Sequence, residues 1–181
     1  MPLCTSRTSQ HVLAVNGPRL DVEILLPEVV AKLRGRQESF RGVGLIDTGA
    51  SITCISGRAA RALNLKPIAT VRCGGATGDA ETPLFMVSLA FPGSPIRIPD
   101  TKAIEATLEQ QGLDVLIGRD VLAVSGFTYD GPAGSWTLEL PREPAQPLQL
   151  SSPGASSLDR AKANARRKAA EASRKKNRRK K

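Results

Sequence analysis

Apolar and polar residues alternate over several short stretches of the chain, and this two-residue period predicts β-strands. In residues 86–91, Met, Ser and Ala alternate with Val, Leu and Phe. Gly, Pro, Asn and Asp, which favour turns, separate most of these stretches. We therefore expect an all-β fold with strands at residues 11–15, 20–26, 42–46, 52–55, 68–72, 84–91, 96–98, 101–106, 113–117, 127–129 and 136–140.

One or two short helices interrupt this strand pattern. Ser56 is a typical N-cap for an Ala-rich helix over residues 57–63, and a second helix is expected over residues 119–124. Residues 28–33 are compatible with a single helical turn. They belong to a polar insertion, residues 27–41, whose role the sequence does not indicate.

The main candidate for chemistry lies at the end of the apolar stretch 42–46, in the sequence Asp47-Thr48-Gly49-Ala50. Asp is disfavoured inside strands and Gly marks turns, so Asp47 is expected where a strand ends. A carboxylate held there can act as a general acid or base. The simpler alternative is a strand and turn with a solvated Asp.

Two further segments follow in a fixed order. Gly74, Gly75, Ala76, Thr77 and Gly78 form a Gly-rich stretch, and Leu116-Ile117-Gly118-Arg119-Asp120 combines two apolar residues with Gly and a charged pair. Together with the Asp47 segment they resemble the retropepsins, the single-domain aspartic proteases of retroviral type. The insertion at residues 27–41 and the hairpin expected at residues 127–140 resemble the small retropepsin-like proteins of bacteria, and the related domains of eukaryotic ubiquitin-shuttle proteins, more closely than the retroviral enzymes.

This resemblance covers roughly residues 10–140 and implies a closed β-barrel of the acid-protease type. It implies that Asp47 is the catalytic carboxylate, that Thr48 braces the active-site loop, and that Gly49 and Ala50 complete the turn. Aspartic proteases activate water between two carboxylates that share a proton. Because the chain contains a single Asp-Thr-Gly, the resemblance also implies a homodimer with one Asp47 from each copy.

The other two segments receive roles from the same resemblance. Residues 74–78 correspond to a flap over a peptide groove, although an ordinary exposed hairpin tip is an alternative. Leu116, Ile117, Gly118 and Arg119 form the structural second motif. Retroviral enzymes usually place an acidic partner for that Arg directly after the Ala, where this chain has Ser51; Asp79 and Asp120 are the remaining candidates.

The expected function is thus that of an aspartic endopeptidase acting on peptide or protein substrates. One alternative is a catalytically silent peptide-binding or dimerisation module with the same fold. Another is a nucleic-acid-associated protein that acts through a basic tail. Residues 151–181 contain 12 Lys or Arg and two acidic residues, so the net charge of +9 resides in this part of the chain.

The domain organisation follows these changes in composition. We expect a flexible N-terminus (1–9), the protease domain (10–140), a Pro- and Ser-rich linker (141–157) and a disordered Lys/Arg/Ala-rich tail (158–181). Residues 160–181 can bind nucleic acid or another acidic surface without sequence specificity, or serve only to increase solubility.

Cysteine usage and hydropathy limit the remaining classes. Cys4, Cys54 and Cys73 lack CxxC spacing, and His11 is the only histidine, so we expect no disulfide framework, metal site or cofactor. Cys54 and Cys73 are expected to be packed residues rather than a redox pair. The sequence contains no secretion signal and no membrane span, which predicts a soluble, cytoplasmic protein without a membrane partner.

Overall fold

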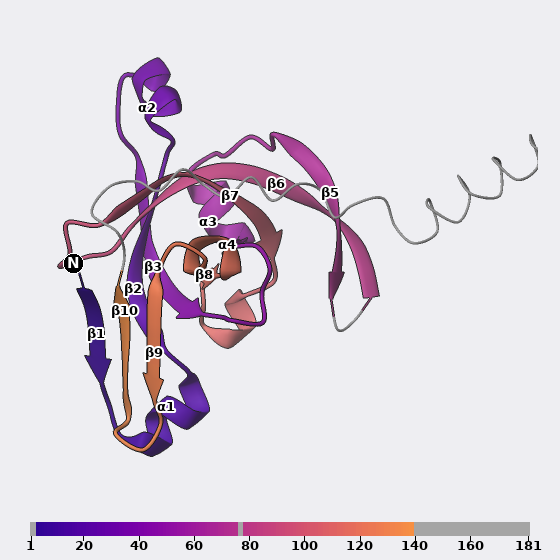
Figure 1. Ribbon diagram of the computed structural model, residues 1–181. Coiled ribbons are helices and arrows are strands. Elements are labelled where there is room, and N and C mark those ends of the chain that lie inside the picture. The colour runs from indigo at the N-terminus through magenta and orange to yellow at the C-terminus, as the bar shows by residue number, and fades with distance from the viewer. Residues whose placement is uncertain (1–2, 76–77, 140–181) are drawn as a thin grey trace, which may run out of the picture. The chain divides into compact units, whose positions relative to one another are not determined.

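A computed structural model describes residues 3–75 and 78–139, which all belong to one compact unit (Figure 1). The strands are β1 (Leu3–Arg7), β2 (Arg19–Leu25), β3 (Ser39–Ile46), β4 (Cys54–Ser56), β5 (Ala69–Gly75), β6 (Gly78–Ala90), β7 (Arg97–Ala106), β8 (Val115–Ile117), β9 (Gly126–Asp130) and β10 (Ser135–Glu139). The helices are α1 (Gln10–Asn16), α2 (Glu28–Arg34), α3 (Gly57–Ala62) and α4 (Arg119–Leu122), with a 3-10 turn, η1 (Glu109–Gln111).

The expected closed β-barrel is confirmed by the strand pairings. The larger sheet has the order β2-β3-β8-β4-β7-β6-β5, and an additional pairing between β2 and β6 closes six of its strands into a ring. The strand β5 extends this ring by pairing with β6 in a long hairpin. Among the strands that the structure describes, β5 is therefore the free edge of this sheet.

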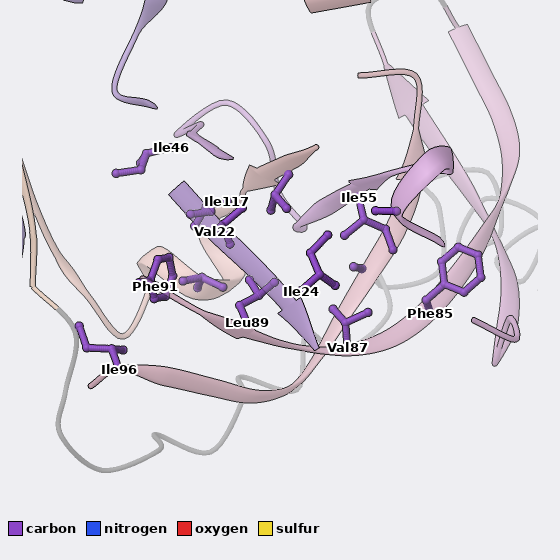
Figure 2. Close-up of a cluster of buried hydrophobic side chains, with 14 of the residues drawn as sticks. Val22, Ile24, Ile46, Ile55, Phe85, Val87, Leu89, Phe91, Ile96 and Ile117 are labelled. Carbon is purple, nitrogen blue, oxygen red and sulfur yellow. The ribbon is translucent and has the colours of Figure 1, made fainter. Parts of the chain in front are cut away.

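The barrel interior is filled by aliphatic and aromatic side chains that alternate with outward-facing residues along the strands. Figure 2 shows this cluster, which includes Val22, Ile24, Ile55, Val87 and Leu89. All five are fully buried. The same cluster includes Trp136 and Leu138 of β10, so the smaller sheet packs against the barrel through a shared core.

The smaller sheet has the order β1-β10-β9 and corrects the expectation for the N-terminus. Residues 1–9 were expected to be flexible, but Leu3–Arg7 form β1, which pairs antiparallel with β10 from Leu3↔Glu139 to Arg7↔Ser135. The turn after β9 secures the end of β1, since the Thr8 N–H donates to the Gly134 carbonyl over 2.8 Å. Long-range pairing thus orders a segment whose local sequence gives no strong signal.

The prediction of a strand at residues 11–15 is wrong, because these residues belong to the helix α1. Ser9 caps the helix by accepting a hydrogen bond from the Val12 N–H over 3.2 Å, and Gly17 ends it with a φ of 70°. Leu13 is the buried residue of the helix. The run His-Val-Leu-Ala-Val contains no alternating polar positions, so its period did not distinguish a helix from a strand.

Other elements match the expectations with altered bounds. The two strands expected at 96–98 and 101–106 form one strand, β7, interrupted by Asp100 with a φ of 47°. The hairpin strands β5 and β6 continue to Gly75 and Gly78, well beyond the expected ends. The helices α1 and α2 raise the number of short α-helices in the described residues to four, from the one or two expected.

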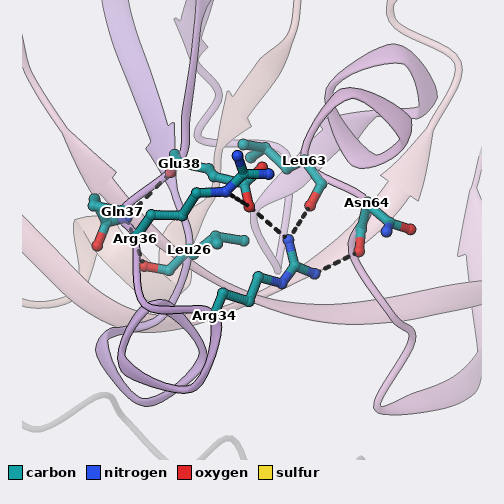
Figure 3. Close-up of polar contacts among 7 residues, drawn as sticks. All are labelled: Leu26, Arg34, Arg36, Gln37, Glu38, Leu63 and Asn64. Carbon is teal, nitrogen blue, oxygen red and sulfur yellow. Dashed lines mark hydrogen bonds and ion pairs between the residues drawn. The ribbon is translucent and has the colours of Figure 1, made fainter.

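The insertion at residues 27–41 contains α2 and packs against the end of α3. Arg34 donates to the carbonyls of Leu63 (3.0 Å) and Asn64 (2.9 Å) and pairs with Glu38 at 3.2 Å (Figure 3). These carbonyls follow the last turn of α3 and precede the strand β5. Arg34 therefore connects the insertion to the segment that leads into the β5–β6 hairpin.

Candidate active site

The Asp47 loop begins where β3 ends at Ile46, as the sequence predicts. The backbone N–H of Asp47 donates to the Ile117 carbonyl (3.0 Å), and the Ala50 N–H donates to the Asp47 carbonyl (3.2 Å). The side-chain oxygen Oδ1 of Asp47 accepts a hydrogen bond from the Gly49 N–H over 2.8 Å. The carboxylate is therefore held in a tight turn while remaining partly accessible to solvent.

The second motif lies beside this loop because β8 runs parallel to β3, with Ile46 opposite Ile117. Gly118 is buried, and a Cβ atom there would lie 2.6 Å from the carbonyl carbon of Ile52. The next residue, Arg119, donates its backbone N–H to the Ala50 carbonyl over 2.9 Å. A glycine at position 118 is thus required for the close approach of the two segments.

Thr53 and Asp120 form a second connection between these segments. Asp120 accepts hydrogen bonds from the Thr53 N–H (3.0 Å) and the Thr53 hydroxyl (2.8 Å). The Thr53 hydroxyl oxygen in turn accepts from the Gly118 N–H over 3.2 Å. These bonds hold the start of α4 against the chain that leaves the Asp47 loop.

Arg119 finds partners in the loop itself. Its guanidinium donates to the Thr48 carbonyl (3.1 Å) and to the Ser51 hydroxyl (2.8 Å). The prediction that Asp120 is the partner of Arg119 is therefore wrong, because the carboxylate of Asp120 accepts hydrogen bonds from Thr53 instead. The side chain of Asp79, the other candidate, lies outside the described residues. Ser51 accepts the hydrogen bond at the position where an acidic residue was expected from the resemblance.

The Gly-rich segment forms the tip of the β5–β6 hairpin. Gly74 lies opposite Asp79 and Gly75 opposite Gly78, while Ala76 and Thr77 lie outside the described residues. The hairpin expected from the sequence is confirmed. Its role as a flap over bound peptide remains a prediction.

An apolar cluster lies on the strands that carry these segments. Its buried members include Cys54, Leu84 and Ile104, and the partly buried side chains of Leu45 and Leu116 pack against it, together with Ile52, Val71 and Cys73. Burial, with smaller effects of Cys73, Asp120 and Asp47, raises the pKa of the Cys54 thiol to about 12. Cys54 and Cys73 are thus packed residues, as expected.

Sequence reasoning missed a second carboxylate with a structural role, Asp114. Its side chain is fully buried and accepts hydrogen bonds from Arg58 Nε (2.6 Å) and another guanidinium nitrogen of Arg58 (2.7 Å), the Ser56 hydroxyl (3.0 Å) and the Val43 N–H (3.2 Å). Burial alone raises the pKa of Asp114, but the hydrogen bonds from Arg58, Val43 and Ser56 outweigh it and hold the pKa below its ordinary value. A polar residue within the apolar run 113–117 was the available signal for this site.

A cavity of about 440 Å³ lies between β1, β2 and the β6–β7 turn, and none of the Asp47 loop residues lines it.

The residues described by the structure contain no cluster of three or more His, Cys, Asp or Glu side chains suited to a metal ion. Across the same described ranges, no helix is both long and apolar enough to cross a membrane.

The family model for aspartyl proteases matches residues 31–121, slightly more than half of the chain, and this range includes the Asp47 loop, the hairpin and the second motif. No curated protein sequence matches the chain significantly. A solution structure of simian foamy virus (mac) protease is similar to it at 16% identity and a TM-score of 0.37, covering 56% of this chain and 87% of that chain. A crystal structure of a retropepsin-like aspartic protease from Rickettsia conorii is similar to this chain at 14% identity and a TM-score of 0.39. The match covers 68% of this chain and 93% of the Rickettsia chain. Because these identities and TM-scores are low, the family assignment depends on the sequence model, and by that model the chain belongs to the aspartyl protease family.

Proposed function

We propose that the protein is an aspartic endopeptidase, active as a homodimer in which Asp47 of each copy activates water for peptide-bond hydrolysis. The observation that carries this proposal is the placement of Asp47 in a loop that the backbone of the second motif fixes on both sides. Before the turn, the backbone N–H of Asp47 donates a hydrogen bond to the Ile117 carbonyl. After the turn, the Ala50 carbonyl accepts a hydrogen bond from the backbone N–H of Arg119. Such fixed geometry is what general acid–base catalysis requires.

The need for a second copy follows from the carboxylates near this loop. Aspartic-protease chemistry uses two carboxylates that share one proton. Asp120 is engaged by both polar groups of Thr53, and Asp114 is engaged by Arg58, Ser56 and Val43. Neither can serve as the partner of Asp47 without losing these bonds. A two-fold axis that brings Asp47 of another copy to this place supplies the missing group.

The apolar cluster beside the loop supports an extended peptide with apolar side chains as the substrate. Leu45 lies two residues before Asp47, Leu116 is the first residue of the second motif, and both side chains are partly exposed. The β5–β6 hairpin, with residues 74–78 at its tip, would cover the bound peptide as a flap. Substrate backbone can approach a Gly-rich tip closely because glycine lacks a side chain.

We also propose a cytosolic location, because Cys4, Cys54 and Cys73 are all free. The linker 141–157 and the basic tail 158–181 lie outside the described residues. Binding of nucleic acid through residues 160–181 remains a prediction from charge alone.

A peptide-library cleavage assay of wild type and Asp47→Asn, at several protein concentrations and mildly acidic pH, tests the proposal. Asn keeps the size of Asp but has no carboxylate, so we expect folded protein with no measurable cleavage. Wild-type specific activity should fall on dilution below the dimer dissociation constant and should be inhibited by a statine-type transition-state mimic. Absence of cleavage by folded wild-type dimers would instead indicate a peptide-binding or dimerisation module.

A further inference from the structure

We propose that a second copy of this chain docks on a surface formed by Val12, Val15 and Tyr129, hereafter the α1–β9 surface. The inference rests on the proposed dimeric protease and identifies the part of each copy that would meet the other. It places the interface on a helix where the sequence predicted a strand.

Half of the exposed large apolar side chains in the described residues lie on this surface. The described residues contain six large hydrophobic side chains that are exposed, and three of them are Val12 (41%), Val15 (68%) and Tyr129 (47%). Val12 and Val15 are three residues apart, so they lie on the same face of α1. Leu13 points the other way and is 1% exposed in the core. The helix is thus anchored by one face and presents an apolar outer face.

Tyr129 extends this outer face onto the neighbouring sheet. Its hydroxyl donates a long hydrogen bond, 3.5 Å, to the carbonyl of Leu13, so β9 and α1 lie side by side (Figure 1). Among the described strands β9 pairs with β10 alone, and four of its five residues are exposed. An exposed strand edge of this kind favours pairing with another chain.

The α1–β9 surface lies at the end of the barrel that carries the Asp47 loop. Three residues after Val15, the Pro18 carbonyl accepts a hydrogen bond from the N–H of Ile46 over 3.1 Å. Ile46 directly precedes Asp47. A copy docked on this surface by a two-fold axis therefore brings its own Asp47 loop towards the first, as the shared catalytic site requires.

The chemistry of the surface distinguishes it from the other exposed apolar residues. The helix α1 has no Asp, Glu, Lys or Arg, and its surface combines Val with Tyr, in keeping with the depletion of charge and enrichment of aromatic residues at interface cores. The helix α2 exposes Val29 (68%) and Leu33 (83%), but it also carries an ion pair between Glu28 and Lys32. It follows the far end of β2, about 20 Å from α1 by the length of that strand.

This contrast provides a matched pair of variants, Val15→Lys and Val29→Lys. Both residues are valines in seven-residue helices with 68% exposure, and Lys has a higher helix propensity than Val, so both variants should fold. We expect Val15→Lys to raise the dimer dissociation constant at least about tenfold, because a charge would be buried at the interface. Val29→Lys should leave it within about twofold of wild type.

The measurement is sedimentation velocity over a concentration series of the full chain, with circular dichroism to verify the fold and a cleavage assay in parallel. Tyr129→Lys provides an independent test from β9 and should weaken the dimer in the same way. The conservative variant Val15→Ile should retain wild-type association.

The possible results separate this inference from the proposed function. Unchanged association of folded Val15→Lys and Tyr129→Lys would overturn the α1–β9 surface, even if wild type cleaves peptides as a dimer. A wild type that is monomeric at all concentrations would overturn it as well. Loss of association in Val15→Lys but not Val29→Lys would support the surface, including in a protein without peptidase activity.

Discussion

Arg119 donates a hydrogen bond over 2.8 Å to the hydroxyl of Ser51, the residue that follows the Asp47-Thr48-Gly49-Ala50 turn. A second bond runs from Arg119 to the Thr48 carbonyl. The guanidinium of Arg119 therefore spans the turn from one side. The backbone N–H of Arg119 donates a further hydrogen bond to the Ala50 carbonyl. A neutral hydroxyl in this position maintains the connection between loop and helix without an ion pair.

The first prediction concerns this pair. Replacing Ser51 with Asp places a carboxylate beside the Arg119 guanidinium and should increase the free energy of unfolding, by no more than about 1 kcal/mol because both side chains are exposed. Urea unfolding at low and high salt measures the effect, and the increase should shrink at high salt. Ser51→Asn is the neutral control. An equal, salt-independent increase in both variants would argue against an ion pair.

A second prediction tests the close packing at Gly118. Its φ of −85° is open to any residue, so the constraint is space: a Cβ atom would lie 2.6 Å from the Ile52 carbonyl carbon and 2.8 Å from the Thr53 nitrogen. Because these are backbone atoms, Gly118→Ala should destabilise the fold by about 1–3 kcal/mol or more and displace the loop. Chemical denaturation of the variant measures this loss.

Gly44→Ala is the matched control for Gly118. A Cβ atom at position 44 would meet side-chain atoms of Leu20 and Val22 at 3.3 and 3.4 Å, and such side chains can move slightly. We expect a loss below about 1 kcal/mol. Equal losses in the two variants would contradict the view that backbone contact at Gly118 is decisive.

The third prediction concerns stability at acidic pH. The folded state holds the pKa of Asp114 below its ordinary value of about 3.8, so ionised Asp114 stabilises the fold above that pH. This contribution should be lost as the pH falls through the folded-state pKa. In urea unfolding between about pH 7 and pH 2, Asp114→Asn should therefore be less stable than wild type near neutrality, with a difference that narrows in acid.

Arg58→Met provides the control for the Asp114 measurement. It leaves the carboxylate in place but removes the guanidinium that bonds to both of its oxygens. Since burial then opposes ionisation with less compensation, the acid transition should move to higher pH. A pH-independent difference between wild type and Asp114→Asn would contradict the role given to this carboxylate.

The fourth prediction concerns the reactivity of Cys54. Because burial raises the pKa of its thiol to about 12, little nucleophilic thiolate forms near neutrality. In native protein at about pH 8, iodoacetamide should modify Cys54 more slowly than Cys4 or Cys73, both of which are partly exposed. Peptide mass spectrometry follows each site. Equal rates for Cys54 in native and denaturant-unfolded protein would contradict the prediction.

Several features of this protein were determined by the sequence alone, because they depend on local chemistry. The apolar run before Asp47 and the Thr-Gly that follows it specify a strand and a turn, and the structure has both. Ser56 caps α3 as expected, since its hydroxyl accepts from the Ala59 N–H within the same turn. The terminal hairpin of β9 and β10 likewise follows from strand alternation around a Gly- and Pro-containing turn.

Only the tertiary structure decided the features that join distant segments. The strand β1 forms because β10, more than a hundred residues later, offers an edge, and α1 forms because Leu13 reaches the shared core while Ser9 and Gly17 cap its ends. The partners of Arg119 and Asp114 were equally inaccessible from the sequence. The sequence offered two candidate partners for Arg119, Asp79 and Asp120, and did not show which of them lies near it. Asp114 meets Arg58 only after β8 and β4 pair. Local residue patterns specify turns and the alternation of apolar and polar residues that is typical of strands. Closure of the barrel determines which buried polar groups meet.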